Sequence, residues 1–325
     1  MKRALFLAIV ALLLPGAGRA DAQVWPTRPV TMVVPFAAGG AVDVMGRILA
    51  GPMSEALGQQ VIVENIGGAG GMTGAARVAK SPPDGYEFVL GHAGTHAQNQ
   101  TLYKHPLYDA SADFTPVELI AEQPTILVTR KDLPAHTLPE FIAYAKVNQT
   151  KMQYGSAGAG AANHLACVLL NAAIGINTTH IPFRGGGPAM QELLAGRIDY
   201  TCNTLTTALP QIEAKEINPI AMLSTRRSPT LPDLPSADEQ GLHNFDASTW
   251  YAIFLPKGAP TPIVQKLHDA IESSVSKPAV LARFKDIGAD LVAPARRSPD
   301  YLGKFVASEI ARWAVPIRAS GVSMD

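Results

Sequence analysis

Apolar runs of the strand type alternate with stretches of helical periodicity along most of the chain. The first part predicts strands at residues 30–36, 61–66 and 86–90, and helices at 42–57 and 74–79. After a Pro-flanked stretch the alternation resumes, with strands at 126–129, 152–154, 180–183 and 198–202, and helices at 138–147, 163–173 and 189–194. Such alternation is typical of α/β proteins with parallel sheets, and its restart indicates two units.

The pattern changes again near Trp250. A buried strand at 250–255 and a turn at 256–262 precede a helix with one apolar face, formed by Ile263, Val264, Leu267, Ala270, Ile271 and Val275. The simplest architecture is two doubly wound lobes, with residues 23–124 and 250–325 in lobe 1 and residues 125–249 in lobe 2. Two crossings between the lobes, near 122–127 and 246–251, predict a hinge, and ligand sites in such sheets face the cleft.

The first 22 residues read as a secretory signal peptide. A basic start, Met1-Lys2-Arg3, leads into the apolar run 4–14, and a small-x-small cleavage pattern ends at Ala22. The apolar run is about half of the roughly 20 residues that a membrane span needs. We therefore expect an exported protein that is soluble in the periplasm.

Composition narrows the classes of partner. Lys plus Arg total 27 and Asp plus Glu total 27, so no net field would attract nucleic acid or an anionic membrane. We expect a monomer whose partners are chosen by a local site.

Two cysteines occur, Cys167 and Cys202. In an oxidising compartment, the only two cysteines of a chain are expected to form a disulfide. Two buried free thiols remain an alternative. A catalytic cysteine is disfavoured because Cys167 lies in an apolar helical pattern.

Two glycine-containing turns are the strongest candidates for a site. Residues 35–43 run from a strand through Gly39 and Gly40 into a helix, and residues 154–164 repeat this arrangement in the second lobe around Ser156. Glycines expose backbone amides, and the first amides of a helix attract anions. One such turn in each lobe suits a carboxylate held from both sides, whereas the alternative is a pair of tight turns without a ligand.

Other motifs carry less chemistry. The glycines at 67–74 fit neither the dinucleotide nor the phosphate-loop spacing, so we interpret them as a structural turn. His92 and His96 lack the glutamate of a metalloprotease motif, which favours loop histidines over metal ligands. Arg184 could pair with a carboxylate, but we favour a role in holding its own loop. No nucleophile, base or cofactor motif is apparent, so we expect neither an enzyme nor a cofactor.

Several short motifs together resemble one family. They are Pro35-Phe36 with Gly39-Gly40 and Asp43, Asn65 with 67–71, Pro83-Asp84-Gly85-Tyr86, His164-Leu165, 180–185, and Leu231-Pro232-Asp233-Leu234-Pro235. In combination they resemble the extracytoplasmic receptors of tripartite tricarboxylate transporters, the Bug family.

The resemblance implies a type II periplasmic binding protein fold that captures a small carboxylate in the cleft, through backbone amides and ordered water, and passes it to membrane transporter subunits. It implies ligand contacts from Phe36, Ala37, Gly39, Gly40, Thr95, Ser156, Ala157, Gly158, Gly160, Asn163, Asp199 and Asn203. The family's small hydroxyl residues before the His-Leu pair are replaced here by Ala161, Ala162 and Asn163. A sensor for a membrane signalling partner and a secreted hydrolase are the alternative functions.

Overall fold

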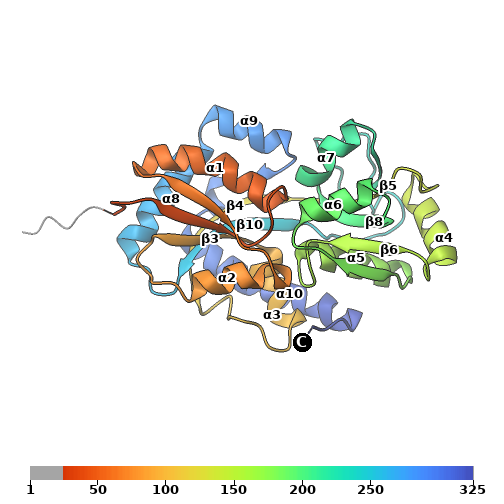
Figure 1. The fold of residues 1–325 in the computed structure, drawn as a ribbon, viewed down its shortest axis with the longest axis horizontal. Helices are drawn as coiled ribbons and strands as arrows, with labels where there is room; N and C mark the ends of the chain where they lie inside the picture. The colour runs from red at the N-terminus through yellow and green to blue at the C-terminus, as the bar shows by residue number, and fades with distance from the viewer. Residues whose placement is uncertain (1–24, 325) are drawn as a thin grey trace, which may run out of the picture.

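The structure is a computed structural model that describes residues 25–324. The predicted signal peptide at 1–22 lies outside the described residues. Figure 1 shows two lobes side by side, each built on its own sheet with helices above and below. Within residues 25–324, no helix combines the length and apolar character needed to cross a membrane.

The first lobe contains a six-stranded sheet in the order β11-β4-β10-β3-β1-β2. Its strands are β1 (Val30–Val34), β2 (Val61–Asn65), β3 (Glu87–His92), β4 (Phe114–Gln123), β10 (Thr249–Pro256) and β11 (Asp290–Leu291). β1, β2 and β3 are parallel, whereas β10 is antiparallel to both of its neighbours. The expected parallel sheet is therefore mixed.

Helices cover both faces of this sheet (Figure 1). One apolar core lies under α1 (Ala41–Leu57), α8 (Thr261–Val275) and α9 (Pro278–Asp286). The other lies under α2 (Met72–Ala79), α3 (Asn99–Leu102) and α10 (Pro299–Ser320). The predicted apolar face of α8 is confirmed, since Val264, Leu267 and Ile271 are buried.

The second lobe contains a five-stranded sheet in the order β7-β6-β8-β5-β9. The strands are β5 (Thr125–Arg130), β6 (Gln153–Ser156), β7 (Thr179–Pro182), β8 (Tyr200–Thr204) and β9 (Ile217–Met222). α4 (Leu138–Asn148) and α5 (Ala162–Ile174) cover one face, and α6 (Gly186–Leu194) and α7 (Leu205–Glu213) cover the other. β5 is antiparallel to β8 and β9, as β10 is to its neighbours in the first sheet.

Local sequence signals account for several helix ends. α4 starts with a capping box, in which the Thr137 side chain accepts from the Glu140 amide and the Glu140 side chain bonds back to the N-cap. α1 ends at Gly58, whose φ of 69° is the left-handed conformation that glycine adopts most easily. Sequence therefore defines where these elements begin and end before tertiary packing acts.

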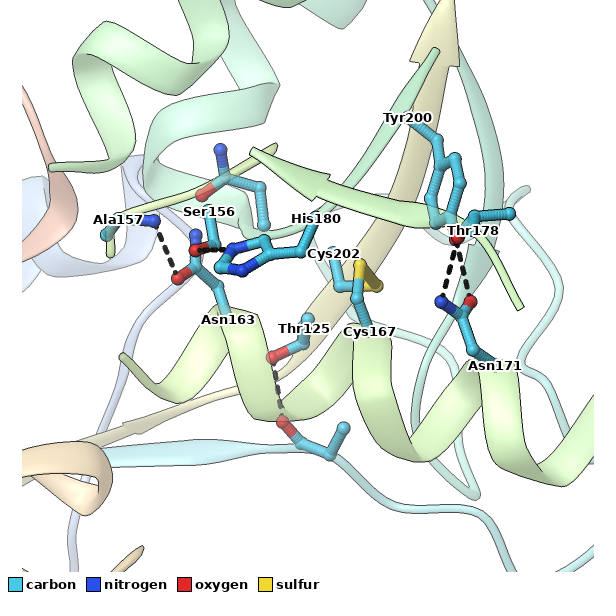
Figure 2. Close-up of a disulfide and its surroundings, with 12 residues drawn as sticks. Thr125, Ser156, Ala157, Asn163, Cys167, Asn171, Thr178, His180, Tyr200 and Cys202 are labelled. Atoms are coloured by element: carbon cyan, nitrogen blue, oxygen red, sulfur yellow. Dashed lines mark hydrogen bonds between the residues drawn. A yellow bond between two sulfur atoms is a disulfide. The ribbon is translucent and has the colours of Figure 1, made fainter. Parts of the chain in front are cut away.

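The chain crosses between the sheets twice, and the two crossings are adjacent. Pro124 separates β4 from β5, and the return path enters β10 at Thr249, which pairs with Gln123. The Thr125 hydroxyl donates to the Ala247 carbonyl at 2.7 Å, which ties the two crossings together (Figure 2). β5 and β10 enter their lobes from the hinge, so they start at the cleft. The parallel strands of each sheet end at the cleft, and β5 and β10 therefore run antiparallel to their neighbours.

Cys167 of α5 and Cys202 of β8 form a disulfide, with Cα atoms 5.4 Å apart (Figure 2). Both residues are fully buried in the core of the second lobe. The bridge joins a helix to the central part of its own sheet, so it stabilises one lobe and leaves the hinge free.

Reduction of the disulfide should destabilise the second lobe. With a sequence separation of 35 between the cysteines, the loop-entropy relation gives about 3 to 4 kcal/mol. Denaturant unfolding of oxidised and reduced protein measures the difference, and a Cys167→Ala/Cys202→Ala variant should not respond to reductant. Equal free energies of unfolding for oxidised and reduced wild type would contradict this prediction.

Candidate functional site

A small cavity of about 50 Å³ lies between the two lobes. Both lobes contribute to its wall, which is formed by Phe36, Gly40, Ala41, Val42, His92, Ala157, Ala162, Asn163, Gly186, Asn203, Thr204, Thr207, Thr249 and Tyr251. This volume is smaller than the roughly 300 to 1,000 Å³ of typical small-molecule sites. The cavity has the position expected of a ligand site in a two-lobed protein.

Four helices start at this wall. Gly40 is the N-cap of α1 and Thr204 the N-cap of α7, while Ala162 and Gly186 are the first residues of α5 and α6. The first amides of a helix have no acceptor within the helix, and the helix dipole places partial positive charge there. Four such ends around one cavity create a strong preference for an anion.

The helix starts face one another across the cleft. A Cβ atom built on Gly40 would lie 3.5 Å from the amide nitrogen of Gly186 and 3.8 Å from that of Gly187. α1 of the first lobe and α6 of the second thus approach closely enough to share one ligand group.

Two buried side-chain donors in the wall lack partners. The Asn203 Oδ1 atom accepts from the Thr204 amide at 2.9 Å, which leaves the Asn203 Nδ2 group without a hydrogen bond. The Thr249 hydroxyl is likewise buried and unpaired. Because a buried donor without a partner is costly, both groups favour a ligand that carries acceptors.

His92 adds a neutral donor to the wall. Its Nδ1 accepts from the Thr95 amide at 3.2 Å, so the neutral ring carries its proton on Nε2. Burial lowers the pKa of His92 to about 4, which keeps the ring neutral at pH 7. The ring also packs against Phe36 at 4.9 Å between centroids. Sequence reasoning placed His92 in a loop, whereas it ends strand β3.

The structure divides the predicted ligand residues of the two turns into two groups. Phe36, Gly40, Ala157, Asn163 and Asn203 line the cavity. Five backbone amides of the two turns already have acceptors within the chain: Ala37 donates to Arg184 O, Gly39 to Asp43 Oδ2, Ala157 to Asn163 Oδ1, Gly158 to Ser156 Oγ and Gly160 to His164 Nδ1. These bonds shape the turns, whereas the first residues of a helix keep amides without an intrahelical acceptor.

Thr95 and Ser156 support the wall from behind. Thr95 is fully buried and its hydroxyl bonds to the backbone of His92. Ser156 is also fully buried, and its hydroxyl lies 2.7 Å from His180 Nε2 and bonds to Gly158 (Figure 2). The Ser156–His180 pair is not part of the cavity wall, so it does not provide the exposed nucleophile that a hydrolase would need.

Asp199 was predicted as a ligand residue, and the structure places it away from the cavity wall. Its two carboxylate oxygens bond to the Arg130 guanidinium at 2.9 Å and to the Gln153 amide at 2.7 Å. It precedes β8, at the end of the strand opposite to Asn203. Asp199 therefore fixes strand pairing in the second lobe and does not reach the cavity.

The lobes also contact each other directly. Besides the bond from the Ala37 amide to the Arg184 carbonyl at 3.0 Å, the Tyr103 hydroxyl donates to the Ala159 carbonyl at 2.8 Å. Gly70 lies against the same loop, where a Cβ would come within 2.3 Å of the Ala159 oxygen. The structure is therefore in a closed arrangement, and the glycine turn around Gly70 contributes to closure.

Two α/β lobes, a two-strand hinge and a cavity closed by both lobes define the class of periplasmic binding proteins. Residues 45–322 match the family described as tripartite tricarboxylate transporter family receptor. The chain belongs to this family and is a substrate-binding receptor of the Bug type.

Solved structures support this assignment. The periplasmic binding protein BugD has a TM-score of 0.90 and 38% identity, with 93% of this chain and 100% of that chain covered. MatC of Rhodopseudomonas palustris, with bound malate, has a TM-score of 0.88 and 38% identity over 90% and 100% of the two chains. Rpa4515 of R. palustris, with adipate, has a TM-score of 0.87 and 35% identity over 92% and 99%.

Gly40→Val should abolish ligand binding with little loss of stability. The added methyl groups would occupy the narrow space between α1 and the start of α6, so the lobes could not close on a ligand. Isothermal titration with the ligand found by screening should show an affinity at least about tenfold weaker, or about 1.4 kcal/mol. Gly51→Val is the matched control, because Gly51 lies in the same helix and faces open space. Unchanged affinity in Gly40→Val would remove this turn from the site.

Acidification should lower the free energy of unfolding. Burial lowers the pKa of His92 and His180 to about 4 and that of His96 and His164 to about 3. Each therefore takes up a proton on unfolding between its folded pKa and the ordinary value of 6.5, while Glu118, whose pKa burial raises to about 9, releases one. On unfolding near pH 5, the four histidines take up about four protons and Glu118 releases about one, so the net uptake should approach about three protons. Urea unfolding at pH 7, 6 and 5 tests this, and a free energy that is constant or rises on acidification would contradict it.

Proposed function

We propose that this chain is a periplasmic receptor that closes its lobes around a small dicarboxylate and delivers it to the membrane subunits of a tripartite transporter. The observation that carries the proposal is the cavity wall, where four helix starts and the unpaired donors of Asn203 and Thr249 converge. Among the described residues of this wall there is no Asp, Glu, Lys or Arg. The wall therefore offers neutral donors to an anion and no countercharge that would compete for them.

Donors in both lobes support a ligand with a carboxylate at each end. The first lobe offers the start of α1 and the His92 Nε2–H group, and the second offers the starts of α5, α6 and α7 with Asn203. Apolar contacts from Phe36 and Ala157 suit the carbon chain between the two charges. Malate and adipate, the ligands of the two R. palustris proteins, are both dicarboxylates.

Closure would provide the selectivity. A ligand that contacts both lobes stabilises the closed state, whereas one that contacts a single lobe has equal affinity for the open and closed states and does not shift the equilibrium. A micromolar dissociation constant corresponds to about 8 kcal/mol, which a few charge-assisted hydrogen bonds and apolar burial supply.

The expected compartment and assembly state fit this role. The pattern at residues 1–22 indicates export, and a buried disulfide is typical of an oxidising compartment. We infer that the exported chain works as a monomer, since both lobes that line the cavity belong to one chain.

Dicarboxylates should raise the melting temperature in a thermal-shift screen. The screen compares succinate, malate and adipate with tricarboxylates, aromatic monocarboxylates, acidic amino acids and a neutral sugar. Ligand at about a hundred times its dissociation constant adds roughly 2.7 kcal/mol of stability. A shift with the sugar and none with any carboxylate would exclude the proposed ligand class.

Asn203→Asp should weaken the affinity for the dicarboxylate at least about a hundredfold, or about 2.7 kcal/mol. The substitution keeps the shape but replaces the unpaired Nδ2 donor with a carboxylate oxygen, which repels the ligand. Asn177→Asp, at an exposed position of the same lobe, is the matched control. Equal affinities for wild type and Asn203→Asp would show that this donor does not face the ligand.

A further inference from the structure

A second cluster of ionisable side chains lies in the first lobe, beneath α8. Glu118 comes from β4, and His268 and Glu272 come from adjacent turns of α8. The His268 Nδ1 atom is 2.9 Å from Glu118 Oε2, and one ligand atom from each of the three residues lies within 4.8 Å of the others. Three potential metal ligands thus converge from two rigid elements.

Glu118 is the unusual member of this cluster. Its side chain is 0% exposed, yet neither carboxylate oxygen has a well-aligned hydrogen bond, and His268 Nδ1 also lacks one. A buried carboxylate without a well-aligned hydrogen bond is costly. Burial and the nearby Glu272 raise the pKa of Glu118 to about 9, so without a cation the carboxyl group holds a proton at neutral pH.

We propose that Glu118, His268 and Glu272 bind a divalent transition metal ion of the zinc type. One imidazole nitrogen and two carboxylate oxygens are ligands that Zn²⁺ accepts, with water in the fourth position. Two negative carboxylates neutralise the charge of the ion, and the ion replaces the proton on Glu118.

The geometry of the cluster suits such an ion. His268 and Glu272 are four residues apart on one helix, so both project from the same face. Ligand atoms around a tetrahedral zinc stand roughly 3.3 Å apart, given bond lengths of about 2.0 to 2.2 Å. The three side chains therefore need small rotations to close around the ion.

Arg297 and the partial exposure of His268 and Glu272 also favour a metal ion in this cluster. The Arg297 guanidinium bonds to Glu272 Oε2 at 3.2 Å, which would hold that carboxylate in place as outer partners of metal ligands do. The side chains of His268 and Glu272 are 16% and 32% exposed, which gives an ion a path to the buried Glu118.

The proposed metal site is separate from the ligand cavity. Glu118 precedes Gln123 at the hinge by five residues of β4, or roughly 17 Å along the strand. An ion there would join α8 to β4 and stabilise the first lobe without contact with the cavity ligand. Its test is therefore independent of the proposed dicarboxylate function.

Zinc binding can be measured on untagged protein freed of metal with a chelator. We expect isothermal titration and elemental analysis after desalting to give one Zn²⁺ per chain, and Zn²⁺ to raise the melting temperature. Glu118→Gln and His268→Gln should each weaken Zn²⁺ binding at least about tenfold. His243→Gln is the control, because His243 is 73% exposed and lies in the other lobe.

Glu118→Gln distinguishes loss of the metal from loss of the fold. The substitution removes a buried ionisable group and keeps its shape, so the variant should fold, and its melting-temperature shift with a dicarboxylate should match that of wild type. Wild type that binds no Zn²⁺ would overturn the proposal and leave Glu118 as a protonated core residue. Equal Zn²⁺ affinity and stoichiometry in wild type, Glu118→Gln and His268→Gln would also overturn it and place the ion elsewhere.

Discussion

The structure depends most on hydrogen-bond donors that the protein cannot satisfy by itself. Four helices start at one cavity, and their first amides have no intrahelical acceptors. Asn203 and Thr249 add two more unpaired donors. Folding tolerates this arrangement because both lobes have complete cores elsewhere, and a ligand with two negative ends would satisfy donors from both lobes at once.

The hinge makes this shared site possible. Because β4 continues into β5 through Pro124 and β10 returns beside it, the two sheets are joined by paired strands, an arrangement typical of hinges. The Thr125 to Ala247 bond keeps the crossings together. The disulfide lies entirely within the second lobe, so it stiffens one body without limiting the motion between the two.

Sequence predicted the fold well because period-2 and period-3.6 patterns identify most strands and helices directly. It missed β4, where Thr115, Glu118, Glu122 and Gln123 interrupt the apolar pattern. It could not show that β10 is antiparallel, since direction depends on where the hinge lies. The two glycine-containing turns that it singled out both contribute residues to the cavity wall. The role of His92 was missed because burial of its ring depends on distant residues. Asp199 precedes β8, whereas Asn203 lies near the carboxyl end of that strand, and this order in the sequence could have separated Asp199 from the site.

The neutral wall of the cavity has a consequence for ionic strength. A site that binds its anion through exposed Arg or Lys side chains loses affinity as the salt concentration rises, because dissolved ions screen these charges. In the proposed site the attraction would come from helix dipoles buried between two lobes, and salt screens buried interactions much less than exposed ones. A receptor of this kind can keep its affinity while the salt concentration outside the cytoplasmic membrane varies with the surroundings of the cell.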